Sequence, residues 1–257
     1  MKQYTVDAFT EKVFAGNPAA VCVMDKWLSD EIMKKIAMEN NLSETAFAVK
    51  EGDLYHLRWF TPAGEVNLCG HATMATSYVI LNIVEPELQQ VKYTTRSGIL
   101  TVTKKGKLLE MNFPVWKHSE IPVTDDMELA FGARPAYAYK SNVLLCVMEK
   151  AEDVRKCKPN QDVILNKLGG GAIITAKDEK YDFVSRVFAP IGMVPEDPVT
   201  GSAHCVLTPY WSEQLGKTEF NAYQASRRGG ELHCELKGDR VFISGYATLF
   251  AESEIYF

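Results

Sequence analysis

One glutamate is a candidate acid–base group, because apolar residues surround it in the sequence. Glu44 lies in the segment 40–47, which reads NNLSETAF. Burial beside Leu42, Ala46 and Phe47 would raise the pKa of its carboxyl group toward the range that suits general acid–base catalysis. A single glutamate is more often a solvated surface charge. The segment alone leaves both interpretations open.

Two other segments have small residues where a helix is expected to begin. Gly70-His71-Ala72 and Gly201-Ser202-Ala203 open stretches that carry few charges, 71–84 and 202–211, which predicts two helices buried on all sides. The first N–H groups of a helix have no partner within it, and its dipole is positive there. The glycines could merely relieve crowding at a sheet-to-helix turn. The matched pair instead favours an anion site, formed by backbone groups near Gly70–His71 and Gly201–Ser202.

Ionisable side chains lie beside both helix starts. His71 titrates near neutral pH and can pass a proton, and Asp197, four residues before Gly201, could orient a substrate or relay charge. Asp197 precedes a proline, so a capping or Asx-turn role is the alternative. His204 lies deeper in its helix, where we expect a core residue.

The elements that must position these residues occur twice in the chain. The pattern Arg-x-Phe-x-Pro-x-Gly is found at 58–64 and again at 186–192, 128 residues later. The two helix starts are 131 residues apart, and Lys-Gly turns at 105–106 and 237–238 are 132 apart. In a chain of 257 residues, these spacings predict a duplicated unit of half the length. We place the halves at 1–116 and 117–246.

Each half has the same predicted elements. A helix at 29–40 has an apolar stripe of Ile32, Met33, Ile36 and Ala37, and 160–168 is a shorter counterpart. Strands are expected at 55–60 and 183–188, and a hairpin closes each half. The predicted fold class is α+β, with two pseudo-twofold-related domains, each a mixed and strongly curved sheet around a central helix. Only the polar stretch 116–128 resembles a linker.

Composition excludes several classes of protein. Hydrophobic residues make up 46% and charged residues 24%, which is typical of a globular protein, and the net charge of −5 gives no reason to bind nucleic acid or an anionic membrane. The uncharged stretch 66–84 contains Asn67, His71 and other polar residues, so a buried helix is favoured over a membrane span. The six cysteines are scattered and include no C-x-x-C pair, which indicates reduced thiols in a cytoplasmic protein.

Metal and nucleotide sites are disfavoured. Cys69, His71, His204 and Cys205 could surround zinc, but neither H-E-x-x-H nor a regular ligand spacing is present. The chain also lacks G-x-G-x-x-G, and the glycines at 169–171 are not followed by a P-loop lysine. We therefore expect no metal and no cofactor.

Five blocks of sequence resemble the PhzF family of isomerases, which has the diaminopimelate epimerase-like fold. They are DAFT (7–10), GNPAAV (16–21), NLSETAF (41–47), NLCGHAT (67–73) and DPVTGSAH (197–204). The resemblance implies that Glu44 is a proton shuttle with His71, Asp197 and Ser202 as partners, in a site between the two domains. It also implies a homodimer, and a first domain completed by residues near 247–257.

The related epimerases and proline racemases use two cysteines, one at each helix start. Here Cys69 takes the first position, but Thr200 takes the second, and Cys205 lies five residues further on. A threonine hydroxyl is too weak an acid to replace a thiol, so we expect Cys69 to be a small packing residue. The sequence predicts a cofactor-independent isomerase of a small carboxylic acid. The alternatives are an amino-acid racemase or epimerase, and a carboxylate-binding protein without turnover.

Overall fold

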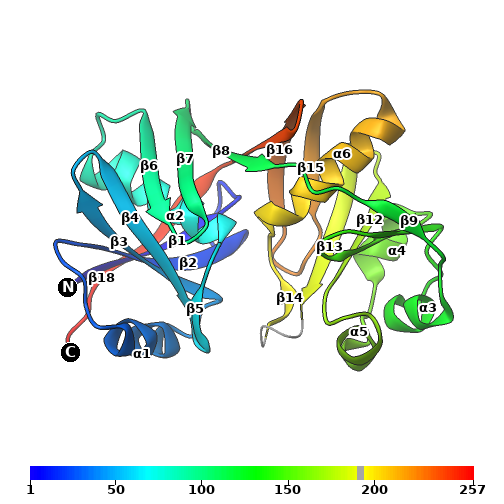
Figure 1. Cartoon of the computed structure of the whole chain (residues 1–257), viewed down its shortest axis with the longest axis horizontal. Coiled ribbons are helices and arrows are strands. Elements are labelled where there is room, and N and C mark those ends of the chain that lie inside the picture. The colour runs from blue at the N-terminus through cyan, green and yellow to red at the C-terminus, as the bar shows by residue number, and fades with distance from the viewer. Residues whose placement is uncertain (190–193) are drawn as a thin grey trace. The chain divides into compact units, whose positions relative to one another are not determined.

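The computed structural model describes residues 1–189 and 194–257. The chain forms two compact units, one made of 1–112 with 244–257 and the other of 113–243 (Figure 1). Both termini belong to the first unit, because the last strand pairs antiparallel with the first, Lys2 opposite Glu254. Pro190 and Gly192 of the second repeat motif lie outside the described residues.

The first unit is built on a mixed sheet. β1 and β2 are antiparallel, β2 and β3 parallel, β3 and β4 antiparallel, β4 and β6 parallel, and β6, β7 and β8 antiparallel, while the short β5 pairs with β4. The strands are β1 (Lys2–Ala8), β2 (Asn17–Met24), β3 (Glu44–Glu51), β4 (Leu54–Thr61), β5 (Gly64–Val66), β6 (Gln90–Thr95), β7 (Gly98–Lys105), β8 (Leu108–Pro114) and β18 (Ala247–Glu254).

Two helices pack on this sheet. Met33, Ile36 and Ala37 of α1 (Asp30–Asn40) pack on Cys22, Phe47 and Phe60, as the apolar stripe predicts. The second helix, α2 (Gly70–Val79), packs against β1, β2, β3 and β18 and continues into a π-helical turn, η1 (Ile80–Val84). Residues 71–77 of α2 are all buried, as the low charge predicts, but the predicted burial of the whole stretch 71–84 is wrong at its end, since 82–84 are exposed in η1.

The second unit repeats the order of strand pairings. β10 and β11 are antiparallel, β11 and β12 parallel, β12 and β13 antiparallel, β13 and β15 parallel, and β15 and β16 antiparallel, while the short β14 pairs with β13. The strands are β9 (Ser119–Ile121), β10 (Tyr137–Lys140), β11 (Leu144–Val147), β12 (Ala172–Lys177), β13 (Phe183–Ala189), β14 (Val194–Asp197), β15 (Glu219–Gln224), β16 (Gly230–Lys237) and β17 (Arg240–Gly245).

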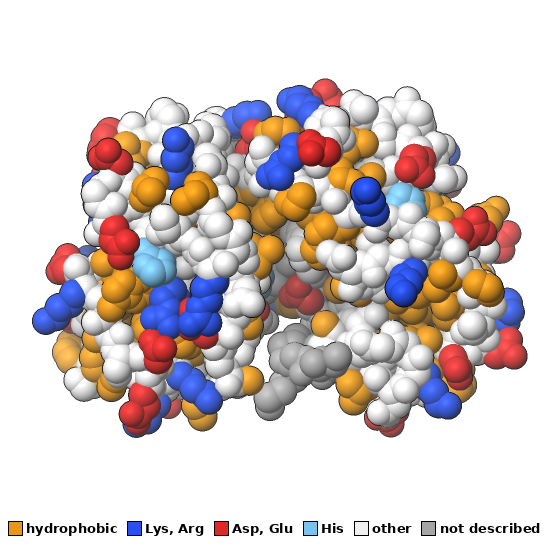
Figure 2. Space-filling view, viewed as in Figure 1, with side chains coloured by type: hydrophobic (Ala, Val, Ile, Leu, Met, Phe, Trp, Pro, Cys, Tyr) orange, Lys and Arg blue, Asp and Glu red, His pale blue; other side chains and the backbone are white. Residues whose placement is uncertain are grey.

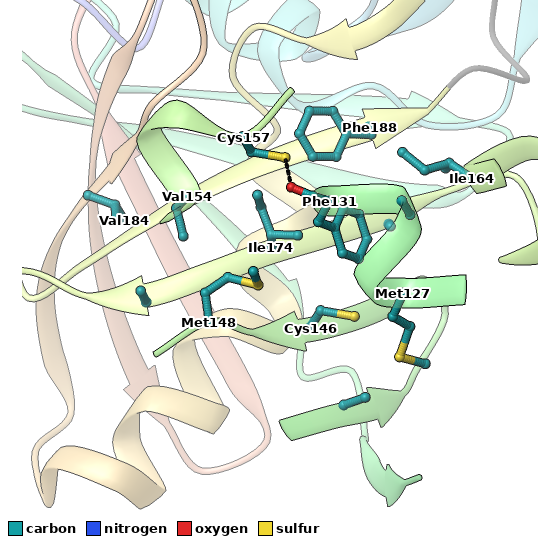
Figure 3. Packing of buried hydrophobic residues seen from close by; sticks show 14 residues of the cluster. Met127, Phe131, Cys146, Met148, Val154, Cys157, Ile164, Ile174, Val184 and Phe188 are labelled. Atoms are coloured by element: carbon teal, nitrogen blue, oxygen red, sulfur yellow. Dashed lines mark hydrogen bonds between the residues drawn. The ribbon is translucent and has the colours of Figure 1, made fainter. Parts of the chain in front are cut away.

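Short helices cover a hydrophobic core in this unit. They are α3 (Asp125–Phe131), α4 (Ala151–Lys156) and α5 (Gln161–Lys167), and α6 (His204–Leu215) follows the 3-10 turn η3 (Gly201–Ala203). Phe131 of α3 stacks on Phe188 of β13, with ring centroids 6.3 Å apart. The Cys157 thiol donates a hydrogen bond to the Phe131 carbonyl oxygen at 3.4 Å (Figure 3).

Some sequence predictions need correction. The α-helix expected to begin at Gly201 begins at His204, because residues 201–203 form the tighter 3-10 turn. The stretch 116–128 is not a linker, since it contains β9 and the first turn of α3. The two predicted hairpin turns are confirmed, with Gly106 and Gly238 at φ of 63° and 60°, a region that favours glycine.

The surface and the thiols agree with the composition. On the face that Figure 2 shows, lysine and arginine side chains are interspersed with aspartate and glutamate. All six cysteines are free and buried. No helix among the described residues is long and apolar enough to cross a membrane.

Candidate active site

Strand alternation directs Glu44 toward the start of α2. Successive residues of β3 point to opposite faces of the sheet, and Phe47 packs against α1. Glu44, three residues earlier, therefore faces the other way. Its Oε2 lies 3.2 Å from Nε2 of His71, the second residue of α2. The side chains are 18% and 6% exposed respectively, so the pair is largely buried while Glu44 keeps access to solvent.

The charges of this pair favour a carboxylate at Glu44 and a protonated ring at His71. Burial raises the pKa of Glu44, but the charge and N–H of His71, together with the thiol of Cys69, lower it below 4.5. Burial lowers the pKa of His71, whereas Cys69 and Glu44 raise it well above 6.5. The expectation that burial raises the pKa of Glu44 is therefore wrong, because His71 lies beside the carboxylate and lowers its pKa more than burial raises it. Glu44 is a carboxylate at neutral pH.

Asn17 contacts the opposite edge of the imidazole. Its Nδ2 lies 3.1 Å from Nδ1 of His71, and the residue is completely buried. The amide nitrogen donates to an unprotonated Nδ1, and after a half-turn the amide oxygen accepts from a protonated one. In both states Nε2 carries the proton that faces Glu44. Asn17 thereby fixes the orientation of the ring.

The backbone before Asn17 is tightly constrained. Gly16 has φ of +64°, and a Cβ there would lie 2.1 Å from the Ala8 carbonyl oxygen. Only glycine fits this turn, which delivers Asn17 to the start of β2. In the parallel ladder, Ala19 of β2 is opposite Glu44, so Asn17, two residues earlier, shares its face. The sequence signal for Asn17 is the GNPAAV block, 16–21.

Cys69 also belongs to this cluster. It is the N-cap residue of α2, 6% exposed, and its Sγ lies 3.5 Å from His71 Nδ1. Burial, together with the negative charge of Glu44, raises the pKa of the thiol to about 11. The residue therefore does more than the packing expected from the sequence, but it is protonated at neutral pH.

A metal ion fits this cluster poorly. Glu44, Cys69 and His71 could each offer one ligand atom, and these atoms lie within 4.8 Å of one another. However, Cys69 approaches Nδ1 and Glu44 approaches Nε2, which are on different edges of the ring. An ion bound at Nδ1 would lie beside Cys69 but away from Glu44, and an ion bound at Nε2 would lie beside Glu44 but away from Cys69. Among the described residues, His204 and Cys205 do not join this group.

The other predicted site residues lie in the second unit. The Thr200 hydroxyl donates to Asp197 Oδ2 at 2.5 Å. Gln224 is completely buried; its Oε1 accepts from the Thr200 N–H at 2.8 Å and its Nε2 donates to the Asp197 carbonyl oxygen at 2.7 Å. Gln224 therefore holds the turn between β14 and η3. The sequence contained no signal for this residue, because the contact depends on β15 lying beside the turn.

Two further predictions concern η3 and α6. Gly201 is buried and Ser202 half-buried in η3, and within the described chain the Ser202 hydroxyl makes no hydrogen bond. His204 is completely buried, as expected of a core residue, and its Nδ1 lies 3.0 Å from the Thr200 carbonyl oxygen. Burial lowers the pKa of His204 to about 4, so the ring is neutral. The meeting of the two helix starts stays a prediction.

Comparison with known proteins identifies relatives along the whole chain. A family model described as phenazine biosynthesis-like protein, PhzC-PhzF, matches residues 6–253. An uncharacterized isomerase of Pseudomonas aeruginosa is 46% identical over 253 residues, which is 98% of this chain and 97% of the relative. The crystal structure of a PhzF-family phenazine biosynthesis protein from Enterococcus faecalis is similar with a TM-score of 0.98 and 48% identity, covering 100% of this chain and 99% of that one.

More distant structures share the fold alone. A probable proline racemase from Agrobacterium radiobacter has a TM-score of 0.63 and 11% identity, covering 99% of this chain and 92% of the other. At that identity the likeness carries no information about the reaction.

Proposed function

Because the chain belongs to the PhzF family of phenazine biosynthesis-like proteins, whose relatives include named isomerases, we propose that it moves a proton within a small carboxylic acid without a cofactor. The observation that carries this proposal is the contact between Glu44 and His71, 3.2 Å long and largely buried. The contact places a carboxylate base next to an imidazole, and the Glu44 side chain keeps 18% of its surface exposed.

Glu44 is the group that takes and returns the proton. Its pKa lies below 4.5, so the carboxylate is ready to act as a base at neutral pH. It removes a proton from an activated carbon of the substrate, and the electron pair of that C–H bond spreads into the conjugated system. The neutral carboxylic acid then returns the same proton to a different carbon. His71 keeps the carboxyl group oriented throughout, and Asn17 keeps the ring in place.

The substrate carboxylate binds at the start of α2. This helix is ten residues long, and the first N–H groups, including those of Gly70 and His71, favour an anion. From the family resemblance we propose that Gly201 and Ser202 also bind the substrate, and that Asp197 orients it. The resemblance also supports a homodimer, which analytical ultracentrifugation tests.

Racemisation by a pair of thiols is the weaker proposal. Cys69 has a pKa of about 11 and is a neutral thiol. The matching position holds Thr200, whose hydroxyl donates to Asp197. No second thiol base is available there, so a single carboxylate explains the residues better.

The test is proton exchange in heavy water. The purified protein is incubated with a panel of small unsaturated acids and amino acids, and NMR follows deuterium uptake and product formation. We expect enzyme-dependent uptake together with a shifted double bond in an unsaturated acid. Inversion at the α-carbon of an amino acid would support the epimerase instead. Tight binding without exchange would indicate a binding protein.

A further inference from the structure

The repeated Arg-x-Phe motif forms a clamp in the first unit. Arg58 of β4 binds Glu65 of β5 with two parallel hydrogen bonds, Nε to Oε1 at 2.8 Å and Nη2 to Oε2 at 2.6 Å. The side chains are only 14% and 9% exposed. Arg96 adds a contact to Oε2 at 2.6 Å. Such a bidentate pair fixes direction as well as distance.

The second unit contains the same clamp. Arg186 of β13 binds Glu196 of β14, Nε to Oε1 at 2.6 Å and Nη2 to Oε2 at 2.8 Å. Its third nitrogen, Nη1, donates to the carbonyl oxygens of Val154 and Cys157. Glu65 and Glu196 are 131 residues apart, the spacing that also separates Gly70 from Gly201.

The phenylalanine of the motif supports the arginine. Residues two apart on a strand share a face, and the guanidinium of Arg58 lies 5.1 Å from the ring centroid of Phe60. The corresponding distance from Arg186 to Phe188 is 5.0 Å. A planar guanidinium over a ring is well placed for a cation–π contact. The spacing Arg-x-Phe therefore has a physical reason in both units.

A serine holds each of these segments at a second point. Ser97, in the turn between β6 and β7, donates to the carbonyl oxygen of Asn67 at 2.8 Å. Ser226, between β15 and β16, donates to the carbonyl oxygen of Pro198 at 2.7 Å. Asn67 and Pro198 each lie three residues before the helix-start glycine. The two serines do not correspond in the sequence repeat, so only the structure shows that they do the same thing.

In each unit, the arginine–glutamate clamp and the serine hydrogen bond both contact the segment that leads to a helix start of the proposed site. The leading segments, 65–69 and 196–200, join the clamped glutamate directly to Gly70 or Gly201. We propose that Arg58 and Arg186, with Ser97 and Ser226, are positioning residues that hold these segments so that the helix starts stay in catalytic register. In the first unit, the contact that depends on this hold is the one between His71 and Glu44.

This inference rests on the proposed function for its kinetic readout, but a second readout needs no substrate. The ¹⁵N NMR titration of His71 reports its contact with Glu44, since that contact raises the pKa of the ring. Arg58→Met keeps the apolar stem and removes the fork. Arg58→Lys keeps the charge and loses the bidentate geometry. Ser97→Ala removes the second hold in an exposed turn, where the fold is least at risk.

The expected result is a loss of turnover with little loss of binding. Arg58→Met and Arg58→Lys should lower kcat by about tenfold or more, with KM within about threefold, because small misplacements of reacting groups are costly. The titration of His71 should move toward its ordinary value. Ser97→Ala should show the same pattern to a smaller degree. Arg134→Met is the control. Arg134 contacts two carboxylates, those of Asp125 and Glu128 in the first turn of α3, a helix outside the proposed site, just as Arg58 contacts those of Glu65 and Asp30.

Folded Arg58→Lys and Ser97→Ala proteins with the kcat and the His71 titration of the wild type would overturn the inference. The clamp would then contribute stability alone, a result that a lowered Tm in the same variants would record. If Arg58→Met does not fold, the other two variants still decide. If exchange survives Glu44→Gln, the proposed function fails, whereas the His71 titration still tests the clamp.

Discussion

Replacing His71 tests how the protein keeps Glu44 in its basic form. In His71→Leu, the donor and the positive charge are gone and burial remains, so the pKa of Glu44 should rise. A hydrogen bond to a charged group contributes about 1.5–3 kcal/mol, and 1.36 kcal/mol corresponds to a factor of ten. At pH values below the raised pKa, the ionised fraction of Glu44 in His71→Leu should therefore be roughly tenfold to a hundredfold lower than in the wild type.

The assay is kcat/KM for proton exchange between about pH 4 and pH 9. The wild type should lose activity only as the pH falls through a value below 4.5, whereas His71→Leu should lose it at a higher pH. His71→Gln is the matched control, because its amide N–H can replace the Nε2–H without carrying a charge. Its acidic limb should lie at a pH between those of the wild type and His71→Leu. An acidic limb in His71→Leu at the same pH as in the wild type would show that His71 does not lower the pKa of Glu44.

The same substitution changes the pH dependence of stability. In the wild type the pKa of Glu44 is lower in the folded state than the ordinary 4.5, so ionised Glu44 stabilises the fold above that pH. This contribution is lost as the pH falls through the folded value. In His71→Leu the pKa is raised by burial, so the sign reverses and the variant should gain stability on mild acidification. Urea unfolding at several pH values measures this difference.

Three other substitutions have defined outcomes. Cys69→Ala should keep exchange within about fivefold, because the thiol is protonated and not the base; a loss of more than about a hundredfold in kcat would show that it is. Phe188→Ala should lower the free energy of unfolding by about 3–5 kcal/mol, since the ring is completely buried in the core of the second unit. A urea-derived change below about 1 kcal/mol would contradict that packing. Gln224→Leu should cost about 1–3 kcal/mol for each polar group left unpaired at Thr200 and Asp197, and unchanged unfolding would refute the hold on that turn.

Much of the fold was predictable from periodicity. The stripe of Met33, Ile36 and Ala37 predicted the face that α1 buries, and the low charge of 71–84 predicted the burial of α2, although not the exposure of 82–84 after it. These predictions succeed because a 3.6-residue period and a lack of charge are local properties. The start of α6 was placed three residues too early, because nothing local distinguishes a 3-10 turn from the first turn of an α-helix.

The candidate site was predictable only in its central residues. Glu44 and His71 were identified from their neighbours and from the family resemblance, and the structure brings them into contact. The effect of that contact on the pKa of Glu44 was not predictable from the sequence. Burial raises this pKa and a nearby donor lowers it, and only the geometry shows which effect is larger. Asn17 and Gln224 were missed for a related reason: each acts through a strand distant in sequence.

The partners of the two clamp arginines were also not predictable from the sequence. The repeat of Arg58 and Arg186 was visible in the sequence, but their partners Glu65 and Glu196 lie across hairpins whose register no local pattern fixes. Repeated residues without an evident role are thus useful markers. In this chain they identify the segments that lead to α2 and η3.

In the mechanism that we propose, one carboxylate, that of Glu44, moves the proton. The most direct test is enzyme-dependent exchange or isomerisation of a turned-over substrate by Glu44→Gln, which keeps the shape of the side chain and removes its basicity. The matched control is Glu31→Gln, since Glu31 is an exposed glutamate of α1. We expect Glu44→Gln to lose activity by about a thousandfold, while Glu31→Gln keeps the rate of the wild type. Folded Glu44→Gln protein that retains activity within a few-fold would show that Glu44 is not the base.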